Sequence, residues 1–292
     1  MRTNRLIHSK LLKACLLIVG ICLFLWSVTI SYERQKLKTE SHLKSYLTAT
    51  VKDLNNEIIK STETLHSLAS LFKTISPVTK DIFEKFTSSL SSKKNASLLI
   101  EWQPLVLEKD KKTFSIYARK LGVKNFKMLE PTKDGKFINA KKRKEHFPVL
   151  FSYSTIGQKS TVGLDLSWSK ERMRSKLLAR DQGVPVASNS FEVFLTEGSR
   201  KSKLGFAITL PVYNQRVETK DERIKHLKGF LAAVFYVKEL VAPSLAKLEA
   251  HNIGYKITDL ANKKTLVDKK FDIYQKISKS ETINVYGQKW KI

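Results

Sequence analysis

The sequence feature that most limits the fold is an apolar stretch close to the N-terminus. Residues 14–30 read ACLLIVGICLFLWSVTI and contain no charged side chain. A membrane-spanning helix needs about 20 apolar residues. Leu11 and Leu12 extend the stretch toward that length across Lys13, whose amine can reach the membrane interface. The sequence therefore predicts one transmembrane helix at residues 14–30.

Charged residues on either side of the stretch predict its orientation. Four basic residues and no acidic residue precede it: Arg2, Arg5, Lys10 and Lys13. The segment that follows, SYERQKLKTE, carries both signs of charge. Because basic loops stay in the cytoplasm, we expect residues 1–13 to be a cytoplasmic tail and the remainder to lie outside. A cleaved signal peptide is the alternative, but no small-residue cleavage site follows Ile30.

The cysteines and the charge balance indicate the compartment. Both cysteines, Cys15 and Cys22, fall inside the apolar stretch. Secreted eukaryotic domains of this size usually carry disulfides, so the sequence favours a bacterial single-pass protein of the inner membrane with a periplasmic C-terminal part. The net charge of +26 would favour nucleic acid in a cytosolic chain, but this topology argues against that partner. Solubilising lysines or contact with anionic lipid explain the charge instead.

A heptad pattern follows the apolar stretch. Apolar residues recur at alternating spacings of four and three, with Ser61 at the one polar position of the series, and no Gly or Pro interrupts the pattern before Pro77. This seam consists of Leu47, Val51, Leu54, Ile58, Leu65, Leu68, Phe72 and Ile75. The pattern predicts a stalk helix at residues 31–76. Two interpretations stay open: a stalk that forms a homodimer and transmits motion, or an amphipathic helix that packs on its own domain.

The pattern changes after Pro77. Short β-rich runs such as FPVLFSYST, LGFAITLPVY and GFLAAVFYV are separated by helical stretches at residues 110–121, 168–180 and 238–249. Strands interrupted by helices of this length predict an α+β fold.

Motifs for catalysis are missing from the sequence. The six histidines show no HxH, HxxxH or HExxH spacing, and the chain has neither a G-x-S-x-G elbow nor a phosphate-binding glycine loop. No cysteine lies outside the apolar stretch to act as a nucleophile. We therefore expect no enzyme activity, no metal and no cofactor, and we assign no catalytic residue.

Single residues carry local predictions. Gly183 follows a helical stretch and predicts a left-handed C-cap, whereas Gly205 opens a strand where a neighbour packs closely. Asp165 precedes a helix that begins near Ser167, so capping or tying a loop is a better interpretation than ligand contact.

Five stretches, each weak alone, form an ordered set behind the predicted transmembrane and stalk helices. They lie at residues 102–104, 147–151, 163–166, 177–191, and 204–215 together with 229–241. Their order and residues resemble the CHASE domain, the extracytoplasmic sensor of cytokinin receptors and of many bacterial histidine kinases and diguanylate cyclases. The resemblance implies two PAS-like modules in series on the stalk, a membrane-distal one at 77–225 and a membrane-proximal one at 226–292. Family members usually continue into a second membrane helix and an output domain, which this sequence does not contain. It is a natural short form, a fragment, or a chain that acts through a separate signalling partner.

The resemblance also implies a ligand pocket in the distal module. Cytokinin-binding members use a buried carboxylate and a small hydroxyl at positions that match Ser154 and Ser188. Since a serine hydroxyl cannot replace the charged acceptor, we expect a small molecule other than adenine. The alternation of side chains along the strands adds further candidates. The candidate ligand-binding residues are Tyr153, Ser154 and Ser188 as orienting groups, with Phe206 and Ile208 as apolar walls.

These observations favour a membrane-anchored sensor that binds an unknown small molecule and relays the event through its stalk. The alternative is an envelope scaffold that senses nothing and uses its basic exterior face to meet lipid or a protein partner.

Overall fold

The computed structural model describes residues 2–90, 97–132, 134, 136–154, 161–194, 202–271 and 277–292. The chain forms two compact units. One consists of Met1–Thr48 with Ile273–Lys279, and the other of Ala49–Asp272 with Ser280–Ile292. We refer to the second as the sensor unit.

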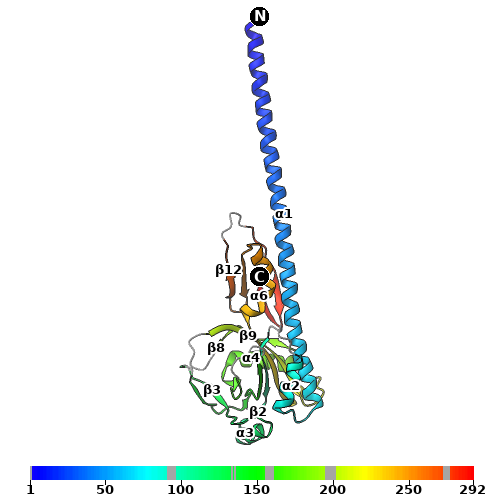
Figure 1. Cartoon of the computed structure of the whole chain (residues 1–292), viewed down its shortest axis with the longest axis vertical. Coiled ribbons are helices and arrows are strands. Elements are labelled where there is room, and N and C mark those ends of the chain that lie inside the picture. Colours follow the sequence, from blue (N-terminus) through cyan, green and yellow to red (C-terminus); the bar gives the residue numbers. More distant parts are fainter. Residues whose placement is uncertain are drawn as a thin grey trace. The chain divides into compact units, whose positions relative to one another are not determined.

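Helix α1 (Arg2–Thr74) is continuous over 73 residues (Figure 1). Among the described residues it is the one helix long and apolar enough to cross a membrane, and its side chains from Leu16 to Val28 are largely exposed in the protein alone. The predicted transmembrane and stalk segments are therefore parts of a single helix. It ends at Thr74, three residues before Pro77, in agreement with the tendency of helices to end ahead of proline.

The sensor unit contains a six-stranded antiparallel sheet in the order β6-β1-β10-β9-β7, with β8 paired to β9. The strands are β1 (Ser97–Pro104), β6 (Phe151–Ser154), β7 (Val186–Ala187), β8 (Phe191–Phe194), β9 (Ser202–Tyr213) and β10 (Leu227–Tyr236). Strands β9 and β10 are long and almost entirely buried at the centre, as their apolar sequences require.

One face of this sheet packs on two helices, the part of α1 within the sensor unit and α2 (Lys80–Leu90). The ring of Phe72 on α1 stacks on Trp102 of β1, and Phe83 on α2 packs against Phe151 of β6 with ring centroids 5.3 Å apart. The opposite face is covered by α4 (Lys170–Gln182), which an Asp165-capped 3-10 turn, η2 (Leu166–Trp168), precedes.

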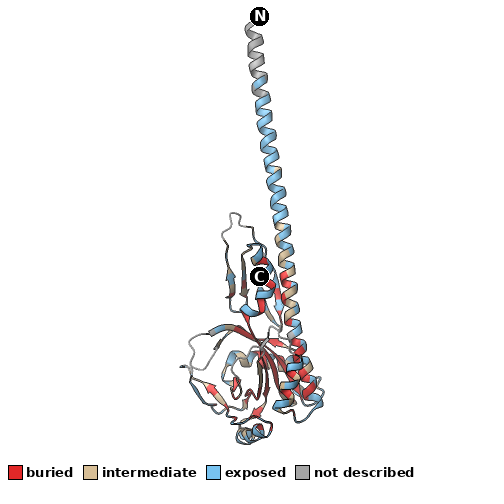
Figure 2. Ribbon diagram, in the orientation of Figure 1, coloured by how far each residue is buried: buried red, intermediate tan, exposed pale blue. Residues whose placement is uncertain are grey.

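The heptad seam packs on its own domain from Val51 onward (Figure 2). Its members Val51, Leu54, Ile58, Leu65, Leu68 and Phe72 are all buried within the sensor unit. Of the two interpretations that the sequence left open, the structure therefore supports the amphipathic helix over this part of the seam. Ile75, beyond the end of the helix, is 39% exposed.

A second, four-stranded sheet follows α6 (Val237–Ala250), in the order β12-β11-β14-β13. Its strands are β11 (Tyr255–Asp259), β12 (Lys264–Lys269), β13 (Thr282–Val285) and β14 (Gln288–Lys291). Trp290 of β14 meets Phe206 of β9 edge to face at 4.9 Å, which joins the two sheets. Since β10 lies between β1 and β9, the change from one sheet to the other falls at α6, after the boundary predicted at 225/226.

Shorter elements complete the described part of the sensor unit. They are β2 (Val106–Leu107), η1 (Glu108–Asp110), α3 (Lys111–Lys120), β3 (Leu129–Pro131), β4 (Phe137–Asn139), β5 (Glu145–His146) and α5 (Lys220–Lys225). The whole is a mixed α+β fold, as predicted.

Two glycines have the roles that the sequence predicted. Gly183 ends α4 in the left-handed conformation, with φ of 74°. A side chain at Gly205 would lie 2.6 Å from both the Phe235 carbonyl oxygen and a methyl of Val193. Only glycine allows β8, β9 and β10 to approach this closely.

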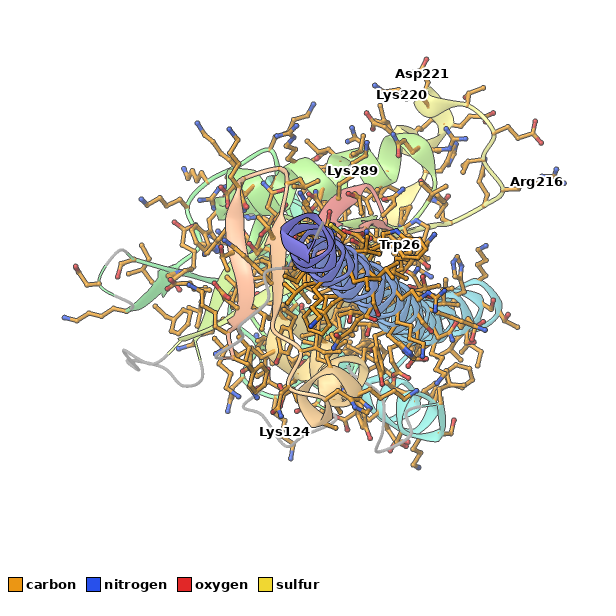
Figure 3. All side chains as sticks on the ribbon, turned by 90° about the horizontal axis from the view of Figure 1, so that it is seen from above. Trp26, Lys124, Arg216, Lys220, Asp221 and Lys289 are labelled. Carbon is orange, nitrogen blue, oxygen red and sulfur yellow. The ribbon has the colours of Figure 1, made fainter. Side chains whose placement is uncertain are left out.

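The basic surplus is spread over the sensor unit. Lys124, Arg216 and Lys289 are exposed, and their side chains point in different directions in Figure 3. This distribution fits solvated charges better than a single basic face.

Candidate functional site

The sheet face beneath α4 carries a row of polar side chains in an otherwise apolar core. Ser152 of β6 pairs with Glu101 of β1, Glu101 with Ala232 of β10, and Ala232 with Thr209 of β9. Directly paired residues point to the same face of a sheet, and so does Gln103, two residues beyond Glu101. Glu101, Gln103 and Thr209 are buried.

Hydrogen bonds hold the Glu101 carboxylate in place. Gln103 donates from Nε2 to Oε2 of Glu101 at 2.7 Å, and the hydroxyl of Thr161 donates to Oε1 at 2.6 Å. Oγ1 of Thr161 also lies 3.3 Å from the hydroxyl of Ser152. Both carboxylate oxygens therefore have a partner, and the side chain is fixed in one orientation.

Helix α4 places two cations over this row. Arg172 and Lys176 are four residues apart and so lie on one face of the helix, whose first turn Ser169 caps. Nζ of Lys176 donates to Oε1 of Gln103 and lies 5.0 Å from the ring centroid of Phe230. The Arg172 guanidinium carbon lies 4.3 Å from the ring centroid of Phe191. We call Glu101, Gln103, Thr161, Arg172 and Lys176 the polar cluster.

The interior shifts the titration of both cations. Burial lowers the pKa of Lys176 to about 7; the Glu101 carboxylate opposes this shift, and the Arg172 charge adds to it. Burial also lowers the pKa of Arg172, again against the effect of Glu101. A buried cation is costly unless it is paired, so an ammonium and a guanidinium with one shared carboxylate leave positive charge in excess.

The predicted ligand residues fall on different sides of the sheet. Ser154 shares the face of Ser152 and lies near the polar cluster, whereas Tyr153 points to the face packed on α1 and α2. Ser188 bonds to the backbone: its hydroxyl donates to the carbonyl of Asn189 at 2.9 Å and accepts from the amide of Ala207 at 3.0 Å.

Phe206 and Ile208 lie on the face opposite to the polar cluster. They are separated by one residue, so they share the face on which Phe206 stacks on Phe235 at 5.0 Å. Of the five predicted residues, Ser154 therefore shares the face of the polar cluster by its position on β6, and Ser188 lies just beyond the end of β7, bonded to the backbone.

Sequence reasoning missed the five members of the polar cluster. A signal was present in the run SLLIEWQPLVL, where Glu101 and Gln103 are polar residues two apart in a strand that is otherwise apolar. No such signal marks Arg172 and Lys176, because KERMRSKLLARDQ reads as an ordinary solvated helix.

A second buried network ties the short elements together. The ring of His146 lies between two carboxylates, with Nδ1 2.7 Å from Asp165 and Nε2 2.7 Å from Glu108. Asp165 also accepts from the amide of Phe147 at 3.0 Å and from the amide of Ser167 at 3.1 Å. This confirms that Asp165 caps a helix and ties a loop. Each group is engaged by its neighbours, so we assign the network a structural role.

A comparison with solved structures shows what the fold is similar to. A structure described as an extracellular ligand binding receptor from Desulfohalobium retbaense DSM5692 superposes with a TM-score of 0.51 at 12% identity, over 86% of this chain and 39% of that chain. The likeness shows a shared fold, and our chain spans about two fifths of that receptor's length.

The family follows from the sequence itself. The model of the CHASE domain matches residues 76–267, so the chain belongs to the CHASE domain family. A further structure, the ligand binding domain of the Pseudomonas aeruginosa PAO1 amino acid chemoreceptor PctC in complex with GABA, has a TM-score of 0.44 at 13% identity, over 87% of this chain and 97% of that chain. The search of curated proteins produced no match.

Proposed function

We propose that this protein is a membrane-anchored sensor that binds a small molecule at the polar cluster and relays binding through β1 to α1. One observation carries the proposal. Strand β1 presents Glu101 and Gln103 to the cluster and, from the residue between them, Trp102 to Phe72 of α1.

The composition of the cluster supports ligand binding. A sheet face that serves packing alone is more stable with apolar residues than with a partly compensated set of charges. Here a lysine with a strongly lowered pKa lies in the interior beside a guanidinium, and perturbed groups of this kind gather at functional sites. A ligand that completes the electrostatic pairing would recover part of the cost of burying them.

The alternation of side chains along β1 supports the relay. A ligand that displaces Glu101 or Gln103 displaces the same backbone that carries Trp102. The Trp102 ring contacts α1, where the carbonyl of Phe72 also accepts a hydrogen bond of 3.0 Å from Nζ of Lys228 on β10. The relay requires that the ligand bind one arrangement of β1 and α1 more tightly than another.

The remaining parts of the proposal concern architecture and location. The two main sheets, each with its helices, would be two PAS-like modules. The anchor would cross the inner membrane of a bacterium once, with the sensor unit in the periplasm. Binding would be non-catalytic, and a separate signalling partner would read the change. A homodimer would form through surfaces of α1 other than the buried seam.

The envelope scaffold is the weaker candidate. It would use a basic face, whereas exposed lysines and arginines are distributed over several sides of the sensor unit. It also assigns no function to the buried Lys176 and the part-buried Arg172 of the polar cluster.

A thermal-shift screen of the full chain in lipid nanodiscs against small metabolites tests the proposal. A ligand at one hundred times its Kd adds about 2.7 kcal/mol to the free energy of unfolding. Gln103→Leu, which removes the hydrogen-bond partner of both Glu101 and Lys176, should abolish the effect, while Gln215→Leu, at an exposed position, should leave it intact. A hit that stabilises wild type and Gln103→Leu alike would place the ligand elsewhere, and a library without hits would contradict the sensor.

A further inference from the structure

We infer that the ligand of the polar cluster is a small organic monocarboxylate, whose carboxylate group pairs with the Arg172 guanidinium and the Lys176 ammonium. The inference rests on the proposed function and adds the chemical class of the ligand.

The first argument is the balance of charge within the site. Arg172 and Lys176 project from one face of α4, and Glu101 is the acidic member of the cluster. Both oxygens of Glu101 already accept hydrogen bonds, from Gln103 and from Thr161. Among the described residues, Glu101 forms no ion pair within 4.0 Å with either Arg172 or Lys176. Within the cluster, two basic side chains thus share one carboxylate whose oxygens are both engaged, and Asp165 acts on Lys176 from outside the cluster.

The second argument concerns the contacts that the Arg172 guanidinium makes and the donors that it has left. One side of Arg172 lies over the ring of Phe191. Within the described part of the chain its side chain donates no hydrogen bond, so its edge is left for an acceptor. A stacked, planar guanidinium with free edge donors is suited to a bidentate carboxylate.

The third argument excludes other classes of ligand. A cationic amine would face two positive charges against one negative charge. A neutral molecule would leave the excess uncompensated. With Lys176 protonated, a monoanion balances the charges of the cluster, whereas a dianionic phosphate would add a second negative charge.

The surroundings of the cluster indicate an apolar remainder on the ligand. Leu99 precedes Glu101 by two residues on the same face and packs in a buried group with Val234 and Tyr236. Phe230, beside Lys176, belongs to a second buried group with Phe147. A short carbon chain or ring attached to the carboxylate would meet these side chains without unpaired polar atoms.

The test uses matched ligand pairs on the full chain in nanodiscs. The probes are acetate, propionate, lactate, pyruvate and benzoate, each beside its neutral amide, with ethylamine and inorganic phosphate added. We expect at least one carboxylate to raise the melting temperature and to bind at least about tenfold more tightly than its amide, since a lost charge-assisted pair is worth that much.

Variants then locate the carboxylate. Arg172→Gln should weaken binding at least about tenfold, whereas Arg174→Gln, at an exposed position of the same helix, should not. Without ligand, the Arg172→Gln variant should have a melting temperature no lower than that of wild type, because the substitution removes one of two like charges. A merely structural arginine would instead lower the melting temperature and leave the preference for carboxylates over amides unchanged.

Proton uptake gives an independent measurement. At pH 8 a bound anion should draw a proton onto Lys176, so calorimetry in two buffers of different ionisation enthalpy should detect uptake, which Lys176→Met should remove. Binding of amides or ethylamine alone, sensitive to Glu101→Gln, would overturn the monocarboxylate and leave the sensor standing. Failure of every probe and of the wider metabolite library would overturn both.

Discussion

The ring of Phe72 on α1 lies nearly flat on the indole of Trp102 on β1, with centroids 4.1 Å apart and an angle of 29° between the planes. Trp102 stands between Glu101 and Gln103, whose side chains leave the opposite face of the strand. A single strand thus separates the polar cluster from the helix that could cross the membrane.

Removal of the Phe72 ring should lower the stability of the sensor unit. Phe72→Ala deletes a buried aromatic side chain and should lower the free energy of unfolding by about 3–5 kcal/mol in urea titrations. Phe137→Ala, where the ring is 39% exposed, is the control and should cost much less. Equal losses in the two variants would mean that the stack contributes little.

The His146 network should make stability depend on pH in a defined direction. Burial opposes a charge on His146, but the hydrogen bonds with Asp165 and Glu108 outweigh it and raise the pKa of the imidazole. A raised folded-state pKa contributes stability that is full below the unfolded value of about 6.5 and is lost as the pH rises through the folded value.

The difference in unfolding free energy between wild type and His146→Gln should therefore shrink from pH 6 toward alkaline pH. Urea titrations at several pH values measure it. His66→Gln, on an exposed position of α1, should show no such trend. A constant difference across this range would mean that folding does not shift the pKa of His146.

Lys176 should give the opposite trend. Its folded-state pKa of about 7 lies below the ordinary value of 10.5, so the unfolded chain binds more protons between these values. Relative to Lys176→Met, the free protein should gain stability as the pH rises from about 7 toward 10. Lys170→Met, at an exposed lysine of the same helix, is the matched control. Parallel profiles for wild type and Lys176→Met would show that the ammonium is not desolvated.

The orientation of the chain can be measured with reporters. Alkaline phosphatase, which is active only outside the cytoplasm, should be active when fused after Ile292, and a cytoplasmic fluorescent reporter fused there should be dark. The reason is the basic segment with Arg2, Arg5, Lys10 and Lys13 ahead of the apolar stretch. The reverse pattern would contradict the proposed location.

Local patterns in the sequence were sufficient for the long N-terminal helix, the α+β class and the roles of Gly183, Gly205 and Asp165. Each depends on neighbours within a few residues. The pairing of β10 with β1 could not be predicted, because it joins segments more than a hundred residues apart.

The residues of the candidate site were harder still to predict from the sequence. A shift of one residue along a strand moves a side chain to the other face. Phe206 and Ile208 were therefore one position away from Ala207 and Thr209, which share the face of the polar cluster. Arg172 and Lys176 gave no signal, because a charged helix reads as solvated until the sheet that it covers is known.

The burial of the seam decides how this sensor could be joined to a foreign signalling domain. Hybrid receptors are commonly spliced by aligning the heptads of two coiled coils. Here the heptad positions from Val51 to Phe72 belong to the interior of the sensor unit, so a splice within them would exchange core side chains for those of another protein. A working junction must lie before Ala49 and must keep the rotation of the helix that carries Phe72 to Trp102.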